Sequence, residues 1–179
     1  GTLGGTGLLF AGGGSLAAGE LSVWSWGSVR APLLVVRDGT DVRCGALHMG
    51  SNAEEKGTLL VESGSLTADG EFWLQNAALT VTGGELTLAG DASIDRGEVH
   101  ISGGTVSFEH GLWLGEGDIV ITGGTVIVPG GEAGLTAENG KVTISAEYPC
   151  LVEDRYIMNP SPIPRYDNPK LHQSQCLYL

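Results

Sequence analysis

Four eight-residue stretches that align without gaps decide the fold. They are LLVESGSL (residues 59–66), LTVTGGEL (79–86), VHISGGTV (99–106) and IVITGGTV (119–126). The last glycine of each stretch recurs every 20 residues, at Gly64, Gly84, Gly104 and Gly124. The apolar residues on both sides of these glycines recur at the same interval. The chain is therefore a repeat in which equivalent positions carry the same class of residue.

Apolar and polar residues alternate within each repeat, which is the period of a β-strand with one buried face. A Gly-Gly pair between two such strands is also compatible with a two-residue hairpin, and hairpins would build a meander or a sandwich. A gapless period favours the other arrangement, an all-β fold that is a single-stranded parallel β-helix (β-solenoid) with ~20-residue coils. The four glycines are then structural residues at its corners, where a positive φ is needed. Like side chains would stack ~4.8 Å apart.

The pattern divides the chain into three parts. Residues 1–56 are irregular coils, in which LVVRDG (34–39) matches LLVESG (59–64) at an offset of 25. Residues 57–147 are the regular 20-residue coils, and together with 1–56 they make the predicted β-solenoid of residues 1–147. Residues 148–179 break the pattern and are rich in Pro and Tyr. We expect this last part to be an irregular C-terminal cap or interaction tail.

Composition excludes several classes of protein. The chain has 179 residues, 30 of them Gly, and a net charge of -12. It lacks a Gly-X-Y period, which excludes collagen, and it lacks an apolar run long enough for a membrane-spanning helix. Residues 57–147 hold 13 acids and 2 bases, whereas residues 148–179 hold 3 of each. Such an acidic chain is not expected to bind nucleic acid, which needs clustered Lys and Arg.

The repeat, together with the opening GTLGGTG (residues 1–7), resembles the passenger-like β-helix repeats of autotransporter-type bacterial surface proteins. The resemblance covers most of residues 1–147. It implies a right-handed parallel β-helix, secretion to the cell surface or extracellular space, and a structural or adhesive role. The tail from residue 148 has no counterpart in that repeat.

Acidic side chains on the wall of the β-helix raise a second possibility, a carbohydrate-active lyase, hydrolase or tailspike-like protein. Asp69, Asp91 and Asp95 are the candidates, because such sites need converging carboxylates. The neighbouring columns hold Ser, Thr and Gly, so we favour a solvated, solubilising surface. No catalytic residue is assigned.

The sequence gives only weak evidence for a metal or cofactor site. Glu98, His100, Glu109 and His110 are chemically suited to zinc, but their spacing matches no zinc motif. We therefore expect exposed histidines, no metal and no cofactor.

Aromatic residues are the candidates for ligand or partner binding. Trp73 and Trp113 are 40 residues apart, which places them in one outward column with Ser93 between them. They form either a platform for a glycan or a protein surface, or they pack under a neighbouring segment, which we favour. Tyr156, Tyr166 and Tyr178 in the tail are candidate anchors for a partner.

Three cysteines leave the pairing open. Cys150 and Cys176 bracket the tail and form a possible disulfide. Cys44 is then either a buried residue or a partner in an intermolecular bridge. The sequence starts at Gly1, so either a leader was removed or the chain is a fragment.

The main hypothesis is a non-enzymatic structural or adhesive protein of the cell surface. Open β-helix ends are strand edges, so we expect a homo-oligomer or filament, assembled through these ends and the tail. The alternative is the carbohydrate-active or carbohydrate-binding β-helix, acting through wall carboxylates or Trp residues.

Overall fold

The computed structural model describes residues 1–25, 31–52, 55–128, 134–144, 150–152 and 157–158. Within these ranges the chain forms strands and turns and no helix. The strands are β1 (Thr2–Gly5), β2 (Gly7–Phe10), β3 (Gly14–Ser25), β4 (Leu33–Val36), β5 (Thr40–Ser51), β6 (Gly57–Val61), β7 (Ser65–Ala68), β8 (Phe72–Gln75), β9 (Ala77–Val81), β10 (Glu85–Leu88), β11 (Ala92–Ile101), β12 (Thr105–Phe108), β13 (Leu112–Glu116), β14 (Ile119–Ile121), β15 (Thr125–Ile127), β16 (Leu135–Asn139), β17 (Val142–Ile144), β18 (Cys150–Val152) and β19 (Ile157–Met158).

These strands belong to one 19-stranded sheet, and each pairing between the described strands is parallel. The predicted all-β class is confirmed. Parallel pairing also excludes the hairpin alternative among the described strands, because two-residue hairpins join antiparallel strands.

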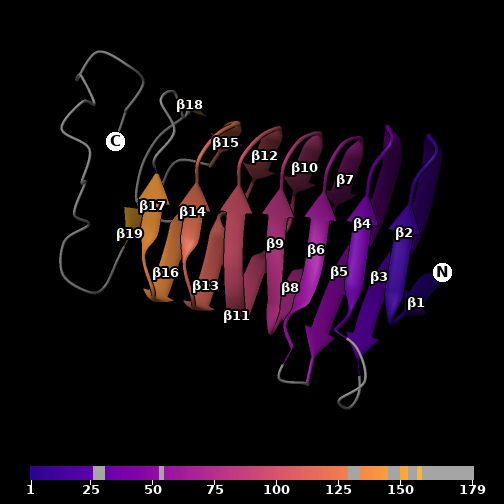
Figure 1. The fold of residues 1–179 in the computed structure, drawn as a ribbon, viewed down its shortest axis with the longest axis horizontal. Coiled ribbons are helices and arrows are strands. Elements are labelled where there is room, and N and C mark those ends of the chain that lie inside the picture. The colour runs from indigo at the N-terminus through magenta and orange to yellow at the C-terminus, as the bar shows by residue number, and fades with distance from the viewer. Residues whose placement is uncertain (26–30, 53–54, 129–133, 145–149, 153–156, 159–179) are drawn as a thin grey trace.

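The register follows the sequence repeat. From β6 to β15, paired strands lie 20 residues apart, as in the series Leu59, Leu79, Val99 and Ile119. The offset then grows to 23, with Leu112 opposite Leu135. In the first part the offset varies: it is 18 between Thr2 and Glu20, 25 between Leu34 and Leu59, and 26 between Leu16 and Val42. Figure 1 shows the result as a row in which β2, β4, β6, β9, β11, β14 and β17 lie side by side.

Alternation along each strand separates a buried face from a wetter one. In β6, Leu59 and Val61 are fully buried while Thr58 and Leu60 are half-buried. Successive strands place their buried residues over one another, so the core is a set of ladders of mostly aliphatic side chains. Burying one Leu or Val side chain contributes about 1.5–3 kcal/mol to the stability of the folded state, and each ladder repeats this contribution from strand to strand.

Glycines occupy the turns between β6 and β7 and their equivalents in the following repeats. Gly64, Gly84, Gly104 and Gly124 have φ values of 89°, 70°, 76° and 80°. A Cβ atom on Gly104 would lie 2.5 Å from the carbonyl oxygen of Gly84 in the preceding repeat. The column therefore needs glycine for two reasons, the left-handed backbone and the close approach of the next turn.

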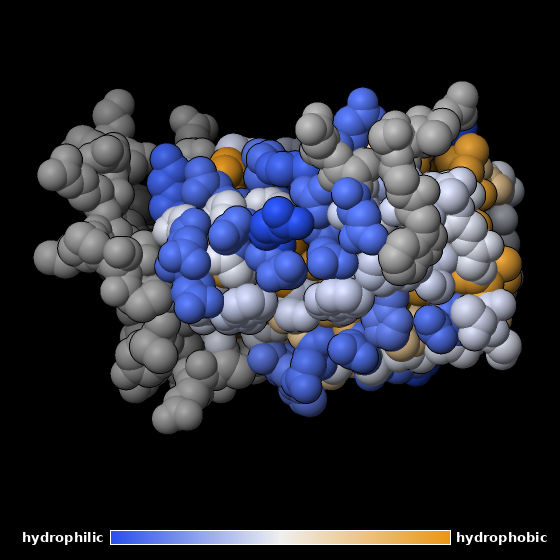
Figure 2. Space-filling model, turned by 90° about the horizontal axis from the view of Figure 1, so that it is seen from below, coloured by the Kyte–Doolittle hydropathy of each residue, from blue (hydrophilic) through white to orange (hydrophobic). Residues whose placement is uncertain are grey.

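The end of the sheet formed by β1, β2 and the start of β4 exposes apolar side chains. Leu3, Leu9 and Leu33 are 37%, 58% and 46% exposed. Figure 2 shows hydrophobic residues gathered at this end, whereas the wall between the two ends is mostly hydrophilic.

Candidate functional site

One outward column of the sheet contains Trp73 and Trp113, two of the aromatic residues that the sequence singled out. Its members, in register, are Ser22, His48, Trp73, Ser93, Trp113 and Thr136. Ser93 thus lies between Trp73 and Trp113, as the spacing of 40 residues predicted. The two indoles differ in surroundings, because Trp73 is half-buried and Trp113 is 41% exposed.

Trp73 packs against two side chains from earlier repeats. Its ring centroid lies 5.4 Å from that of Trp24, with the planes tilted by 50°. The His48 ring meets Trp73 edge-on, at 6.3 Å and 76°. Gly50 makes the Trp24 contact possible, since a Cβ atom there would lie 2.2 Å from the Trp24 ring. Sequence reasoning missed this cluster because Trp24 lies in the irregular repeats.

His48 also lies between two carboxylates. Its Nδ1 is 3.4 Å from Glu20 Oε1, and its Nε2 is 3.3 Å from Glu71 Oε2. Glu20, His48 and Glu71 come from three successive repeats. The sequence pattern predicts which residues share a column. Because the paired strands before residue 57 are separated by irregular offsets, it does not predict which acids lie near the His48 imidazole.

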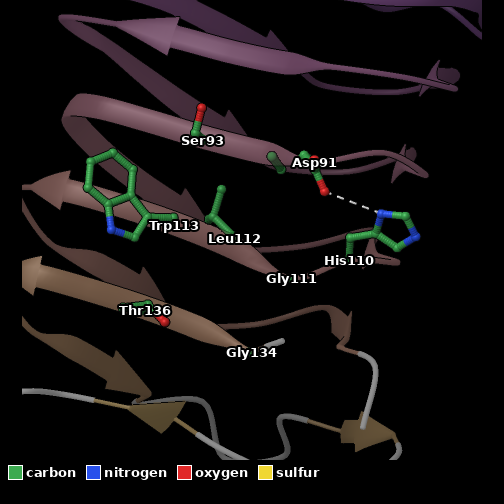
Figure 3. A pocket seen from close by; sticks show the side chains of 9 residues that line it. Asp91, Ser93, His110, Gly111, Leu112, Trp113, Gly134 and Thr136 are labelled. Carbon is green, nitrogen blue, oxygen red and sulfur yellow. Dashed lines mark ion pairs between the residues drawn. The ribbon is translucent and has the colours of Figure 1, made fainter. Parts of the chain in front are cut away.

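A hollow of about 410 Å³ lies beside Trp113. We call it the Trp113 hollow, and its lining includes Asp91, His110, Gly111, Trp113, Gly134 and Thr136. Figure 3 shows the Trp113 indole on one side and the Asp91 and His110 side chains on the other. The Asp91 carboxylate is 3.4 Å from His110 Nδ1.

The three acids proposed for a carbohydrate-active site do not occupy one column. Asp69 follows the Ala68–Leu88 pair, Asp91 precedes the Phe72–Ala92 pair, and Asp95 follows the Leu74–Ile94 pair. Asp69 instead accepts two hydrogen bonds from Arg43, at 2.7 and 2.9 Å. Parallel register separates these carboxylates because each column keeps one position of the repeat.

The candidate zinc ligands likewise do not gather at one point in the described residues. Glu98 accepts a hydrogen bond from Lys56 and pairs with His100 at 3.2 Å. The Lys56 bond, followed by that of His100, lowers the pKa of Glu98. His110 pairs with Asp91. In the part of the chain that the structure describes, no three His, Cys, Asp or Glu side chains are close enough to hold a metal ion.

Cys44 is free and fully buried, and its Sγ lies 3.6 Å from the carbonyl oxygen of Thr67. Burial raises the pKa of its thiol to about 11, and the negative charge of Asp69 acts in the same direction. Such a thiol is unreactive near neutral pH. The proposed disulfide between Cys150 and Cys176, and the anchors Tyr156, Tyr166 and Tyr178, lie outside the residues whose side chains the structure describes.

Comparison with known proteins finds likeness at the C-terminal end. The family model described as "Phosphonate metabolism protein PhnJ" matches residues 135–179. Over 43 residues, 24% of the chain, the sequence is 51% identical to an alpha-D-ribose 1-methylphosphonate 5-phosphate C-P-lyase of Rhizobium meliloti (strain 1021). The corresponding enzyme of Escherichia coli (strain K12) is 44% identical over 43 residues. No solved structure matches the chain.

The matched segment is a small part of this chain and of each relative. It covers 14% of the Rhizobium meliloti protein and 15% of the Escherichia coli protein. The family match starts at Leu135, the first residue of β16, so it includes β16 to β19 and the tail. The long repeat that precedes it lies outside the match.

These matches correct the functional expectations. The resemblance to autotransporter passenger proteins is wrong as a guide to relationship, and with it the expected structural or adhesive role and extracellular or surface location. The carbohydrate-active or carbohydrate-binding alternative and the expectation of a non-enzyme are contradicted by the same matches. The physical reason is that alternating apolar residues around Gly-Gly report a backbone arrangement, which unrelated proteins share.

The described residues contain no helix that is long and apolar enough to cross a membrane. The chain is thus an all-β protein with parallel strands, similar through residues 135–179 to phosphonate metabolism proteins named as C-P lyases.

Proposed function

We propose that this chain is part of an enzyme that acts on phosphonates, and that its C-terminal segment contributes to a C-P lyase. The observation that carries the proposal is the match of residues 135–179, with 51% identity to a lyase over 43 residues. Because the match covers only 14% of that lyase, the proposed contribution is one segment of a larger catalytic assembly. Residues or chains beyond the match would supply the rest of the chemistry.

The distribution of charge supports a role of the tail in binding the substrate. The substrate in the relatives' names carries a phosphonate and a phosphate group, and both are anionic. Residues 57–147 hold 13 acids and only 2 bases, so that part of the surface repels such a molecule. The tail supplies Arg155, Arg165 and Lys170, which are the residue types that bind phosphate oxygens.

For the repeat, we propose a single-stranded parallel β-helix over residues 1–147 that acts as a scaffold for the tail at 148–179. The parallel pairing of equivalent positions from repeat to repeat supports it. So does the continuation of that pairing into β16 and β17, where Leu112 is opposite Leu135 and Ile119 is opposite Val142. The proposed scaffold therefore runs directly into the matched segment.

Partner contacts in such an assembly are also a proposal. The exposed Trp113 and the half-buried Trp73 offer flat apolar area on the outer wall, and the tail adds Tyr156, Tyr166 and Tyr178. Aromatic residues of this kind are common in protein interfaces. A second copy of the chain or another subunit would be the partner.

Isothermal titration calorimetry of the full chain with α-D-ribose 1-methylphosphonate 5-phosphate tests the function. We expect saturable binding, weaker by about tenfold for each cation removed in Arg165→Gln and Lys170→Gln, because a charge-assisted hydrogen bond contributes ~1.5–3 kcal/mol. The matched control is Arg37→Gln, an exposed arginine of the first repeats. Absence of binding to the unmodified chain, or equal losses in Arg37→Gln and Arg165→Gln, would refute the proposal.

A further inference from the structure

The Trp113 hollow exists because two consecutive repeats lack a side chain at one position of the column. The residues that precede Phe72, Ala92, Leu112 and Leu135 in register are Glu71, Asp91, Gly111 and Gly134. The acids of the first two repeats are thus followed by two glycines. The empty positions leave a backbone floor, bordered by Asp91 on the side of the earlier repeats.

An aromatic wall closes the opposite side. The Trp113 side chain is 41% exposed, and its orientation is constrained by Gly115, where a Cβ atom would lie 2.9 Å from Cη2 of the indole. A glycine two residues further on therefore leaves the space in which the ring lies. The volume of about 410 Å³ is within the ~300–1,000 Å³ of small-molecule sites.

The charges around the hollow select the ligand. The Asp91 side chain is 95% exposed, and its ion pair with His110 at 3.4 Å leaves other carboxylate lone pairs free to accept hydrogen bonds. Neither Lys nor Arg is among the residues described as lining the hollow. The surrounding segment carries 13 acids against 2 bases. An anion is repelled here, whereas a cation gains from Asp91 and from the face of Trp113.

We propose that the Trp113 hollow binds an organic cation of the guanidinium or alkylammonium class. The cationic group pairs with the Asp91 carboxylate, and its flat or apolar part lies against the Trp113 indole over the glycine floor. This site is separate from the proposed phosphonate function, because an anionic substrate would be bound by the basic tail.

NMR of the ¹⁵N-labelled full chain tests the proposal. Arginine amide is titrated while the indole N–H signals are followed, and Trp113→Phe identifies the signal of Trp113. We expect a saturable shift of that signal with a dissociation constant on the order of 1 mM. Nα-acetylcitrulline amide, which has a similar shape and carries no charge, should leave the signal in place.

Two variants test whether the charge of Asp91, rather than that of a nearby acid, is needed for binding. Asp91→Asn should weaken binding of arginine amide by about fivefold, as expected for one exposed charge pair with a hydrogen bond. Asp95→Asn removes an acid of the same strand region that does not line the hollow, and it should change the affinity by less than about twofold. An unmoved Trp113 signal, an equal response to Nα-acetylcitrulline amide, or equal affinities of Asp91→Asn and Asp95→Asn would each overturn the proposal.

Discussion

The glycine column at the turns makes the most direct physical prediction. Substitution of Gly104 by Ala adds one methyl group at a position with a φ of 76°. That methyl carbon would lie 2.5 Å from the Gly84 oxygen and 2.7 Å from the Gly83 carbonyl carbon. Both atoms belong to the backbone of the preceding repeat, so neither can rotate away.

A second glycine separates the two contributions to the cost. Gly39 has a φ of 70°, and a Cβ atom there would meet nothing within 4 Å. Gly39→Ala therefore measures the left-handed backbone alone, at ~1–2 kcal/mol, partly offset by the lower entropy of the unfolded Ala chain. Gly104→Ala adds an overpacking cost of ~1–3 kcal/mol. We expect the Gly104 variant to be less stable than the Gly39 variant by about that difference.

Urea denaturation followed by far-ultraviolet circular dichroism measures both free energies of unfolding, and an unchanged m-value shows that the same surface unfolds in each variant. If Gly39→Ala destabilises the protein as much as Gly104→Ala does, the close stacking of turns is not what requires glycine in this column. The explanation would then reduce to backbone conformation at each turn separately.

Three further predictions concern single sites. Because burial raises the pKa of Cys44 to about 11, its contribution to stability is complete below pH ~8.5, the ordinary pKa of an unfolded thiol, and is lost as the pH rises toward 11. Urea titrations across this range, with Cys44→Ala as control, should show that loss. Lys56→Met should cost less than about 1 kcal/mol, since the pair with Glu98 is exposed. Because Lys56 lowers the pKa of Glu98, this cost should disappear when acid protonates Glu98; a cost that persists in acid would contradict the ion pair. Gly50→Ala should displace the Trp24 ring, whose Cζ3 would lie 2.2 Å from the new Cβ, and change the near-ultraviolet circular dichroism; an unchanged spectrum would refute that contact.

Much of the candidate site could be predicted from the sequence, and the part that could not be predicted has a clear physical cause. The shared column of Trp73, Ser93 and Trp113 follows from the 20-residue period alone. The contacts of Trp73 with Trp24 and His48 do not, because those residues belong to repeats with offsets of 25 and 26. The column order also could not show that Gly111 and Gly134 leave a hollow beside Trp113.

The functional error had a different cause. The functional expectation was based on the repeat because the repeat covers most of the chain. The likeness to known proteins that bears on function lies in residues 135–179. The sequence had marked that end as unlike the rest, through its balanced charge and its prolines. Its composition carried no pattern from which a phosphonate enzyme would follow.

By itself the sequence indicated which side chains face the core, and it favoured parallel pairing of the strands over hairpins. Within a parallel sheet, the period of 20 residues with alternating polarity over residues 59–126 leaves no other register that keeps each apolar column buried. Only the tertiary structure decided which charged and aromatic side chains meet, as in the pairs of Arg43 with Asp69 and Lys56 with Glu98. Those partners are 26 and 42 residues apart. Long side chains reach across columns and repeats, so their contacts depend on turn lengths and rotamers that a periodic pattern does not encode.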